Sequence, residues 1–87
     1  MAMNYREKLN EMRDDSLSTQ KAFLVVIAEI RFIATKGEAL PEELIYRREQ
    51  LYAQFNKLIK LHRRISNYCD QHAISMMDKF PEDTSIF

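Results

Sequence analysis

Apolar residues recur with the 3.6-residue period of an α-helix along two stretches of the chain, about residues 5–36 and about residues 41–79. Only residues 37–40 separate the two stretches, and a connection this short makes consecutive helices lie side by side and antiparallel. We therefore predict an all-α fold, with one antiparallel helical hairpin of two long helices over residues 1–80 and a short C-terminal tail over residues 81–87.

The ends of the two predicted helices carry local signals. Asn4 and Glu7 have the spacing of a capping box, in which each side chain accepts a hydrogen bond from a backbone donor at the helix start. Gly37 is the only glycine in the chain and suits the left-handed residue that follows a helix. Pro41 suits the first turn of the second helix. Weak helix formers at residues 13–19 leave a break open there, although we expect one continuous helix.

The second predicted helix has one apolar face, whereas the first has two. The face of the second helix consists of Leu44, Leu51, Phe55, Leu58, Ile65, Cys69, Ala73, Met76 and Phe80. One face of the first helix consists of Phe23, Val26, Ile27, Ile30 and Ile33, and the opposite face of Leu17, Leu24, Val25, Ala28 and Phe32. One hairpin partner cannot cover both faces, and an exposed apolar stripe of this length marks an interface. We expect a homodimer, most simply a two-fold four-helix bundle in which the opposite face of the first helix is the oligomer interface.

Polar residues interrupt both core-facing stripes at matching heights. In the expected antiparallel register, Ser16 and Thr19 of the first helix lie beside His62 and Ser66 of the second. We predict a hydrogen-bonded polar layer there, which would penalise slipped registers at some cost in stability.

Composition and charge restrict the possible fold class, binding partners and cellular location of the chain. Hydrophobic residues make up 46% of the chain and charged residues 30%, which suits amphipathic helices. Thirteen basic and thirteen acidic residues cancel, so no global field attracts nucleic acid or an anionic membrane. The longest apolar stretch is shorter than the about 20 residues that a membrane span needs. With a single cysteine and no signal segment, we expect a cytoplasmic protein without a membrane span.

Residues that could carry chemistry are few. Cys69 and His72 have a spacing that could chelate zinc, but four ligands are needed and no CxxC or HExxH pattern accompanies them. Cys69 lies in the middle of the apolar stripe, where a core residue is expected rather than a reactive thiol. We expect no catalytic residues, no metal and no cofactor, and we interpret the chain as non-enzymatic.

Basic residues on the second helix form the most prominent polar feature, with a core of Lys57, Lys60, Arg63 and Arg64 extended by Arg47 and Arg48. This set is a possible face for a protein partner or for nucleic acid. By analogy of architecture alone, helical-hairpin dimers of the Rop type bind RNA with a bundle face. Against nucleic acid, no aromatic residues interleave with the basic positions, and acidic residues flank them.

The tail ends in two apolar residues, Ile86 and Phe87, after an acidic turn. They either pack back over the hairpin, which we favour, or act as a short motif that inserts into a partner. We expect a protein–protein interaction module, which could be a small helical adaptor, a chaperone-like factor or an inhibitor that binds a larger protein. The alternatives are a Rop-like nucleic-acid-binding regulator that uses the basic face and a purely structural assembly subunit.

Overall fold

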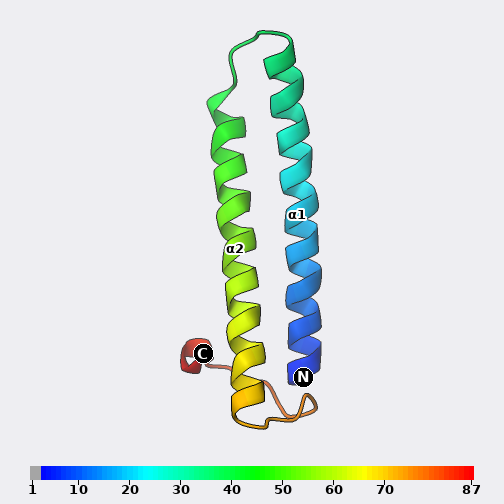
Figure 1. Ribbon diagram of the computed structural model, residues 1–87, viewed down its shortest axis with the longest axis vertical. Helices are drawn as coiled ribbons and strands as arrows, with labels where there is room; N and C mark the ends of the chain where they lie inside the picture. Colours follow the sequence, from blue (N-terminus) through cyan, green and yellow to red (C-terminus); the bar gives the residue numbers. More distant parts are fainter. Residues whose placement is uncertain (1–2) are drawn as a thin grey trace.

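The computed structural model describes residues 3–87 and consists of two long antiparallel helices that lie side by side (Figure 1). Helix α1 spans Tyr5–Thr35, helix α2 spans Glu42–Gln71, and a single 3₁₀ turn, η1, spans Thr84–Ile86. The molecule is elongated, with extents of 55 × 21 × 19 Å. The predicted all-α helical hairpin is confirmed, and α1 runs without a break through residues 13–19.

The turn between the helices follows the predicted signals. Gly37 has a φ of +73°, in the left-handed region that glycine adopts without a steric penalty. The backbone N–H of Gly37 donates to the carbonyl of Ala34, and that of Lys36 donates to the carbonyls of Phe32 and Ile33. These bonds satisfy carbonyls at the end of α1 that have no helical partner. Pro41 then precedes the first residue of α2 in an extended conformation.

The first turn of α1 is capped from two sources. The predicted capping box is present, because the Glu7 N–H donates to the Asn4 side-chain oxygen at 2.8 Å and the Asn4 N–H donates to the Glu7 carboxylate at 3.4 Å. The C-terminal segment supplies two further acceptors. The N–H of Tyr5 donates to the carbonyl of Asp78 and that of Arg6 to the carbonyl of Met76, both at 3.0 Å. Free donors at the start of the helix are thus satisfied by a segment about seventy residues away in sequence.

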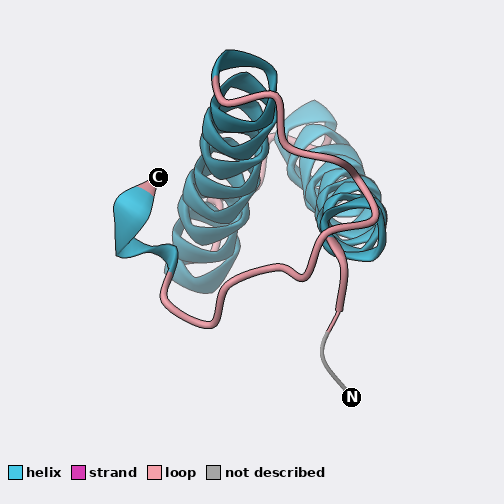
Figure 2. Cartoon of the chain, turned by 90° about the horizontal axis from the view of Figure 1, so that it is seen from below, coloured by secondary structure: helices cyan, strands magenta, loops and turns pink. Residues whose placement is uncertain are grey.

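Helix α2 ends at Gln71, so the predicted continuation to about residue 79 is wrong. Ala73 takes a left-handed conformation with a φ of 51°, and the Ile74 N–H donates to the carbonyl of Cys69, as in a Schellman motif. A straight helix would have extended beyond the start of α1 at Tyr5, leaving its last apolar residues without a neighbour. The chain instead turns and crosses beneath both helices to the outer side of α2 (Figure 2).

Ala73 is the only non-glycine residue with a positive φ among residues 3–87, and this conformation is about 1 kcal/mol or more less favourable for alanine than for glycine. We predict that Ala73→Gly raises the free energy of unfolding by about 0.5–1 kcal/mol, measured by urea denaturation. Ala53→Gly in the middle of α2 is the matched control and should instead lower stability by about 1 kcal/mol. Equal effects of the two substitutions would contradict the helix end described here.

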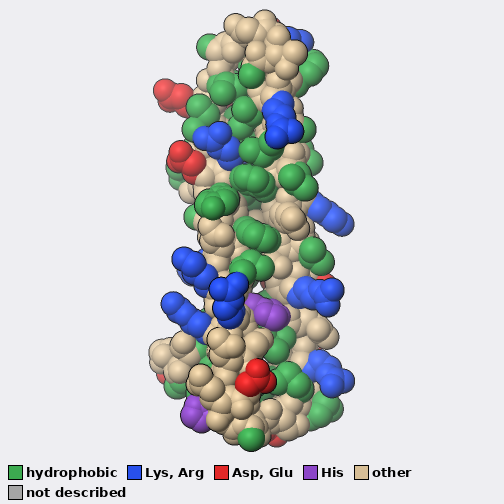
Figure 3. Space-filling model, in the orientation of Figure 1, with side chains coloured by type: hydrophobic (Ala, Val, Ile, Leu, Met, Phe, Trp, Pro, Cys, Tyr) green, Lys and Arg blue, Asp and Glu red, His purple; other side chains and the backbone are tan. Residues whose placement is uncertain are grey.

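The tightly packed core lies at the end of the hairpin where the C-terminal segment crosses. Its buried members are Tyr5, Met12, Ile65, Cys69 and Phe80, with Leu9, Leu61, Ile74, Met76 and Phe87 packed against them. In the half of the hairpin nearer the turn, Val26 is the only described hydrophobic residue that is as fully buried as these core residues. Hydrophobic side chains instead reach the surface of both helices over the half of the molecule nearer the turn (Figure 3).

Candidate interaction surfaces

The side of α1 that points away from α2 carries an apolar surface, which we call the α1 face and define as Leu17, Leu24, Val25, Ala28 and Phe32. All five residues are exposed, with exposed fractions of 47% for Leu17, 56% for Leu24, 61% for Val25 and 62% for Phe32. The α1 face extends from Leu17 to Phe32, which is about 22 Å of helix. The Lys36 ammonium lies 4.3 Å from the centre of the Phe32 ring at the end near the turn. The residues expected at an oligomer interface thus form one exposed apolar strip, which Lys21 interrupts between Leu17 and Leu24.

The opposite side of α1 packs against α2. Val26 is buried, and the other four members of that stripe, Phe23, Ile27, Ile30 and Ile33, are half-buried. The Phe23 ring lies 6.1 Å from the ring of Tyr52 on α2. The division of α1 into two apolar stripes therefore corresponds to one side that is partly covered and one that is open.

The predicted polar layer is only partly formed. Ser16 and Thr19 are buried, at 7% and 6% exposure, and Ser16 lines one shallow hollow together with His62 as the register predicts. The predicted hydrogen bonds between the helices are wrong, however. The Ser16 hydroxyl donates to the carbonyl of Arg13 and the Thr19 hydroxyl to that of Asp15, both at 2.8 Å. His62 and Ser66 are half-buried, and none of the hydrogen bonds within residues 3–87 joins them to Ser16 or Thr19.

Serine and threonine within a helix can donate to a carbonyl three or four residues earlier, and this bond satisfies the hydroxyl without a partner on another helix. The two buried hydroxyls of α1 therefore have their hydrogen-bond partners within α1 itself. Across residues 3–87, no buried side-chain nitrogen or oxygen is left without a hydrogen-bond partner.

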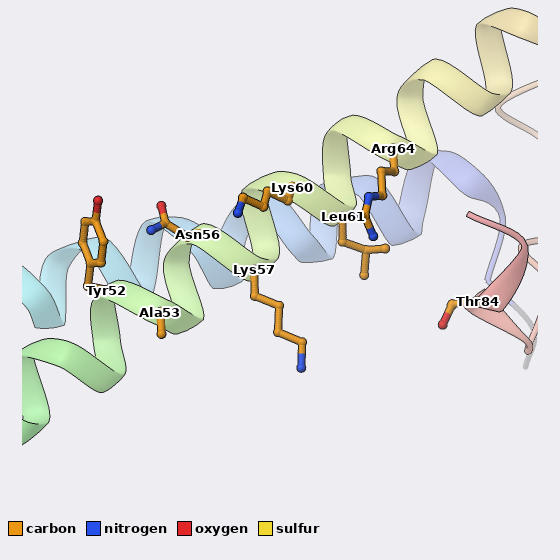
Figure 4. A pocket seen from close by; sticks show the side chains of 8 residues that line it. All are labelled: Tyr52, Ala53, Asn56, Lys57, Lys60, Leu61, Arg64 and Thr84. Carbon is orange, nitrogen blue, oxygen red and sulfur yellow. The ribbon is translucent and has the colours of Figure 1, made fainter.

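A groove of about 680 Å³ runs along α2, and we call it the cationic groove because three basic side chains line it. These are Lys57, Lys60 and Arg64, and the remaining lining residues are Tyr52, Ala53, Asn56, Leu61 and Thr84. Figure 4 shows the α2 residues in succession along the helix and Thr84 across the gap at one end. The C-terminal segment therefore borders one end of a groove that otherwise belongs to one helix.

The three cations of the groove have no acidic neighbour. Lys8 and Glu11, at 3.3 Å, form the one ion pair within residues 3–87. No carboxylate oxygen of the described chain thus lies within 4.0 Å of a Lys57, Lys60 or Arg64 nitrogen. Unpaired cations beside apolar residues present a favourable position for an anionic group from another molecule.

The groove contains only half of the basic set expected from the sequence. Arg63 and Arg47 are exposed but do not line it, and Arg48 instead borders a separate hollow with Phe23, Glu49 and Tyr52. At 100° per residue, Arg47 and Arg48 point to the two flanks of α2 rather than to its outer side. The expectation that no aromatic residue accompanies the basic positions is also wrong, because Tyr52 lines the same groove.

The two apolar residues of the tail behave differently. The Phe87 ring packs at 5.6 Å on Phe80 and meets the ring of Tyr68 edge to face at 5.0 Å. Ile86 remains 52% exposed. Packing back therefore describes Phe87, while Ile86 stays available at the surface. The Asp83 carboxylate accepts a hydrogen bond from the Ser85 N–H at 2.9 Å, and this bond lowers the pKa of Asp83.

Cys69 occupies the core position that its apolar stripe predicts, with 3% exposure. Burial raises the pKa of the Cys69 thiol, and the negative charges of Asp70 and Asp78 raise it further. His72 is exposed, and its ring lies 4.2 Å from the ring of Tyr68. No three His, Cys, Asp or Glu side chains of residues 3–87 are grouped so that they could hold a metal ion.

These features describe an all-α helical hairpin with two exposed surfaces, the α1 face and the cationic groove. No protein-family model matches the chain, and neither a curated protein nor a solved structure matches it. Within residues 3–87, neither long helix is apolar enough over a sufficient length to cross a membrane.

Proposed function

We propose that this chain is a non-enzymatic protein–protein interaction module, a small helical adaptor, chaperone-like factor or inhibitor that binds a larger protein through the cationic groove. The observation that supports the proposal best is the set of three unpaired cations in a groove with an apolar lining. Their complement is a run of carboxylates accompanied by an apolar side chain, which an acidic segment of a protein supplies.

The dimensions of the groove match a short peptide. Tyr52 and Arg64 are twelve residues apart on α2, which corresponds to about 18 Å of helix. An extended peptide of about five or six residues has a similar length. Leu61 and Tyr52 offer contact for an apolar side chain of the bound segment, while the cations contact its carboxylates.

A nucleic-acid-binding regulator of the Rop-like kind is the second candidate, and one observation favours it. Tyr52 accompanies Lys57, Lys60 and Arg64 in the groove, and an aromatic ring beside basic side chains is a pattern that single-stranded nucleic acid uses. Against it, the chain has no net charge.

Charge reversal tests the proposal. The labelled peptide Glu-Glu-Leu-Glu-Glu is titrated by fluorescence anisotropy against the wild-type chain and the variant Lys57→Glu/Lys60→Glu/Arg64→Glu at low salt. We predict binding to the wild type and at least about tenfold weaker binding to the variant, because three favourable contacts become repulsive. The control Arg6→Glu/Arg47→Glu/Lys79→Glu changes the net charge equally at exposed positions outside the groove and should retain wild-type affinity within about twofold.

A single-stranded RNA titrated at about 50 and about 200 mM salt distinguishes the second candidate. Binding of RNA with a steep salt dependence, together with no binding of the peptide, would replace the proposed function with nucleic-acid binding. Equal losses in the two triple variants would show that the groove does not recognise acidic segments and would contradict the proposal.

A further inference from the structure

The α1 face has no partner within the chain. Of the eight large hydrophobic side chains that the described chain exposes, four lie on the α1 face, whereas Tyr46, Tyr52, Met77 and Ile86 are spread over other parts of the molecule. We propose that a second copy of the chain covers the α1 face, so that the two hairpins form a four-helix bundle with the α1 helices at its centre. This inference uses other residues than the cationic groove and does not depend on the proposed function.

The exposed area of the chain fits a dimer. A globular monomer with the mass of this chain, 10.4 kDa, exposes about 5,400 Å². The single hairpin exposes 6,746 Å². The difference of about 1,300 Å² per chain is of the same order as the area that a stable homodimer buries, which is about 1,000 Å² or more on each subunit. Burial of this area against a second copy would leave each chain with about the surface expected for its own mass.

The position of the core indicates where that copy packs. Buried hydrophobic residues concentrate at the end where the C-terminal segment crosses, and Val26 alone represents them toward the turn. The α1 face spans residues 17–32, which is the part of α1 that its own hairpin supports least. A second α1 helix placed there covers apolar surface over about 22 Å and completes the core of the half nearer the turn.

The α1 face is also compatible with its own copy. In an antiparallel arrangement about a two-fold axis beside residues 24 and 25, Leu17 of one copy lies opposite Phe32 of the other. Leu24 then lies opposite Val25, so that large apolar residues meet at the centre and at both ends of the strip. Ala28 lies opposite Lys21 of the other copy, and its small side chain leaves room for the lysine stem. Lys21 lies on the same side of α1 as the strip, and its long side chain can extend to the rim of the interface.

Sedimentation equilibrium with matched variants tests the inference. We expect the wild-type chain to be a dimer at micromolar concentration and Val25→Glu/Phe32→Glu to dimerise at least about 100-fold more weakly, because four carboxylates would be buried at one interface. The control Tyr46→Glu/Met77→Glu introduces the same charges at residues that are 62% and 67% exposed and should remain a dimer.

The face variant could also fail to fold, because the bundle core needs two chains. In that case, the melting temperature of the wild type must rise with chain concentration, as it does when association and folding are coupled. A dimer that persists in Val25→Glu/Phe32→Glu would contradict the inference, and so would a wild-type melting temperature that is independent of concentration. The triple variant of the cationic groove should still dimerise, so a failure of the proposed function and a failure of this inference are distinguishable.

Discussion

Ile65→Ala is expected to lower the free energy of unfolding by about 3 kcal/mol, the usual cost of removing three carbon atoms from a filled core. Ile65 has 0% exposure and is the largest completely buried side chain of the described residues. It lies in the same cluster as Tyr5, Met12 and Cys69, so the cavity would open at the centre of the best-packed region. Urea denaturation at one fixed chain concentration measures the effect.

Ile86→Ala is the matched control, because it removes the same atoms from a residue that is 52% exposed. We expect it to change the free energy of unfolding by less than about 0.5 kcal/mol. Similar losses in the two variants would mean that the core does not lie at the end of the hairpin where the C-terminal segment crosses.

Phe80→Ala is expected to cost about 3 kcal/mol and to release the C-terminal segment from the start of α1. Phe80 is 9% exposed, and its ring meets that of Tyr5 edge to face at 5.3 Å and stacks on Phe87 at 5.6 Å. Its backbone N–H also donates to the carbonyl of Met3 at 2.8 Å. The ring therefore holds both the tail and the segment that caps α1.

Hydrogen exchange separates release of the segment from a general loss of stability. The amides of Tyr5 and Arg6 donate to carbonyls of the C-terminal segment, whereas the amide of Lys8 donates to the carbonyl of Asn4. In Phe80→Ala, the amides of Tyr5 and Arg6 should exchange faster by a larger factor than that of Lys8. Met77→Ala, at a residue that is 67% exposed, is the control and should leave all three rates nearly unchanged. A uniform acceleration in Phe80→Ala would contradict the capping role of the segment.

Most of the hairpin could be predicted because its determinants are local. The capping box at Asn4 and Glu7 and the left-handed turn at Gly37 depend on residues within one helical turn of each other. The division of α1 into a covered and an open stripe follows from a period of 3.6 residues. These signals require no knowledge of which distant segments meet.

The end of α2 could not be predicted, because its determinant is a contact distant in sequence. No glycine or proline marks residues 72–80, and Ala73 adopts a conformation that alanine rarely takes. The reason for the turn is the start of α1, whose free N–H groups donate to the carbonyls of Met76 and Asp78. The same crossing brings Thr84 to the cationic groove, which no sequence spacing indicates.

The polar layer was predicted incorrectly for a different reason. The register placed Ser16 beside His62, but the sequence does not distinguish a hydroxyl that donates across the helices from one that donates to its own helix. The bond to the carbonyl of Arg13 is available in every helical conformation, so it forms without any adjustment of the neighbouring helix. Because this bond within α1 satisfies the Ser16 hydroxyl, the hydroxyl needs no hydrogen-bond partner on α2.

The two proposals combine into one arrangement. If the α1 faces of two copies meet at the centre of a bundle, the two cationic grooves lie on the outer α2 helices and are both accessible. A partner with two acidic segments could then occupy both grooves, and binding at the first would raise the effective concentration at the second. The α1 face would then hold the two copies together, and the cationic groove would bind the partner.

The central claim is that a single hairpin leaves too much apolar surface uncovered to exist alone. Sedimentation equilibrium of the unmodified chain at low micromolar concentration tests it most directly. The account predicts a particle of twice the chain mass of 10.4 kDa. A single sedimenting species with the mass of one chain, which also melts cooperatively, would contradict it.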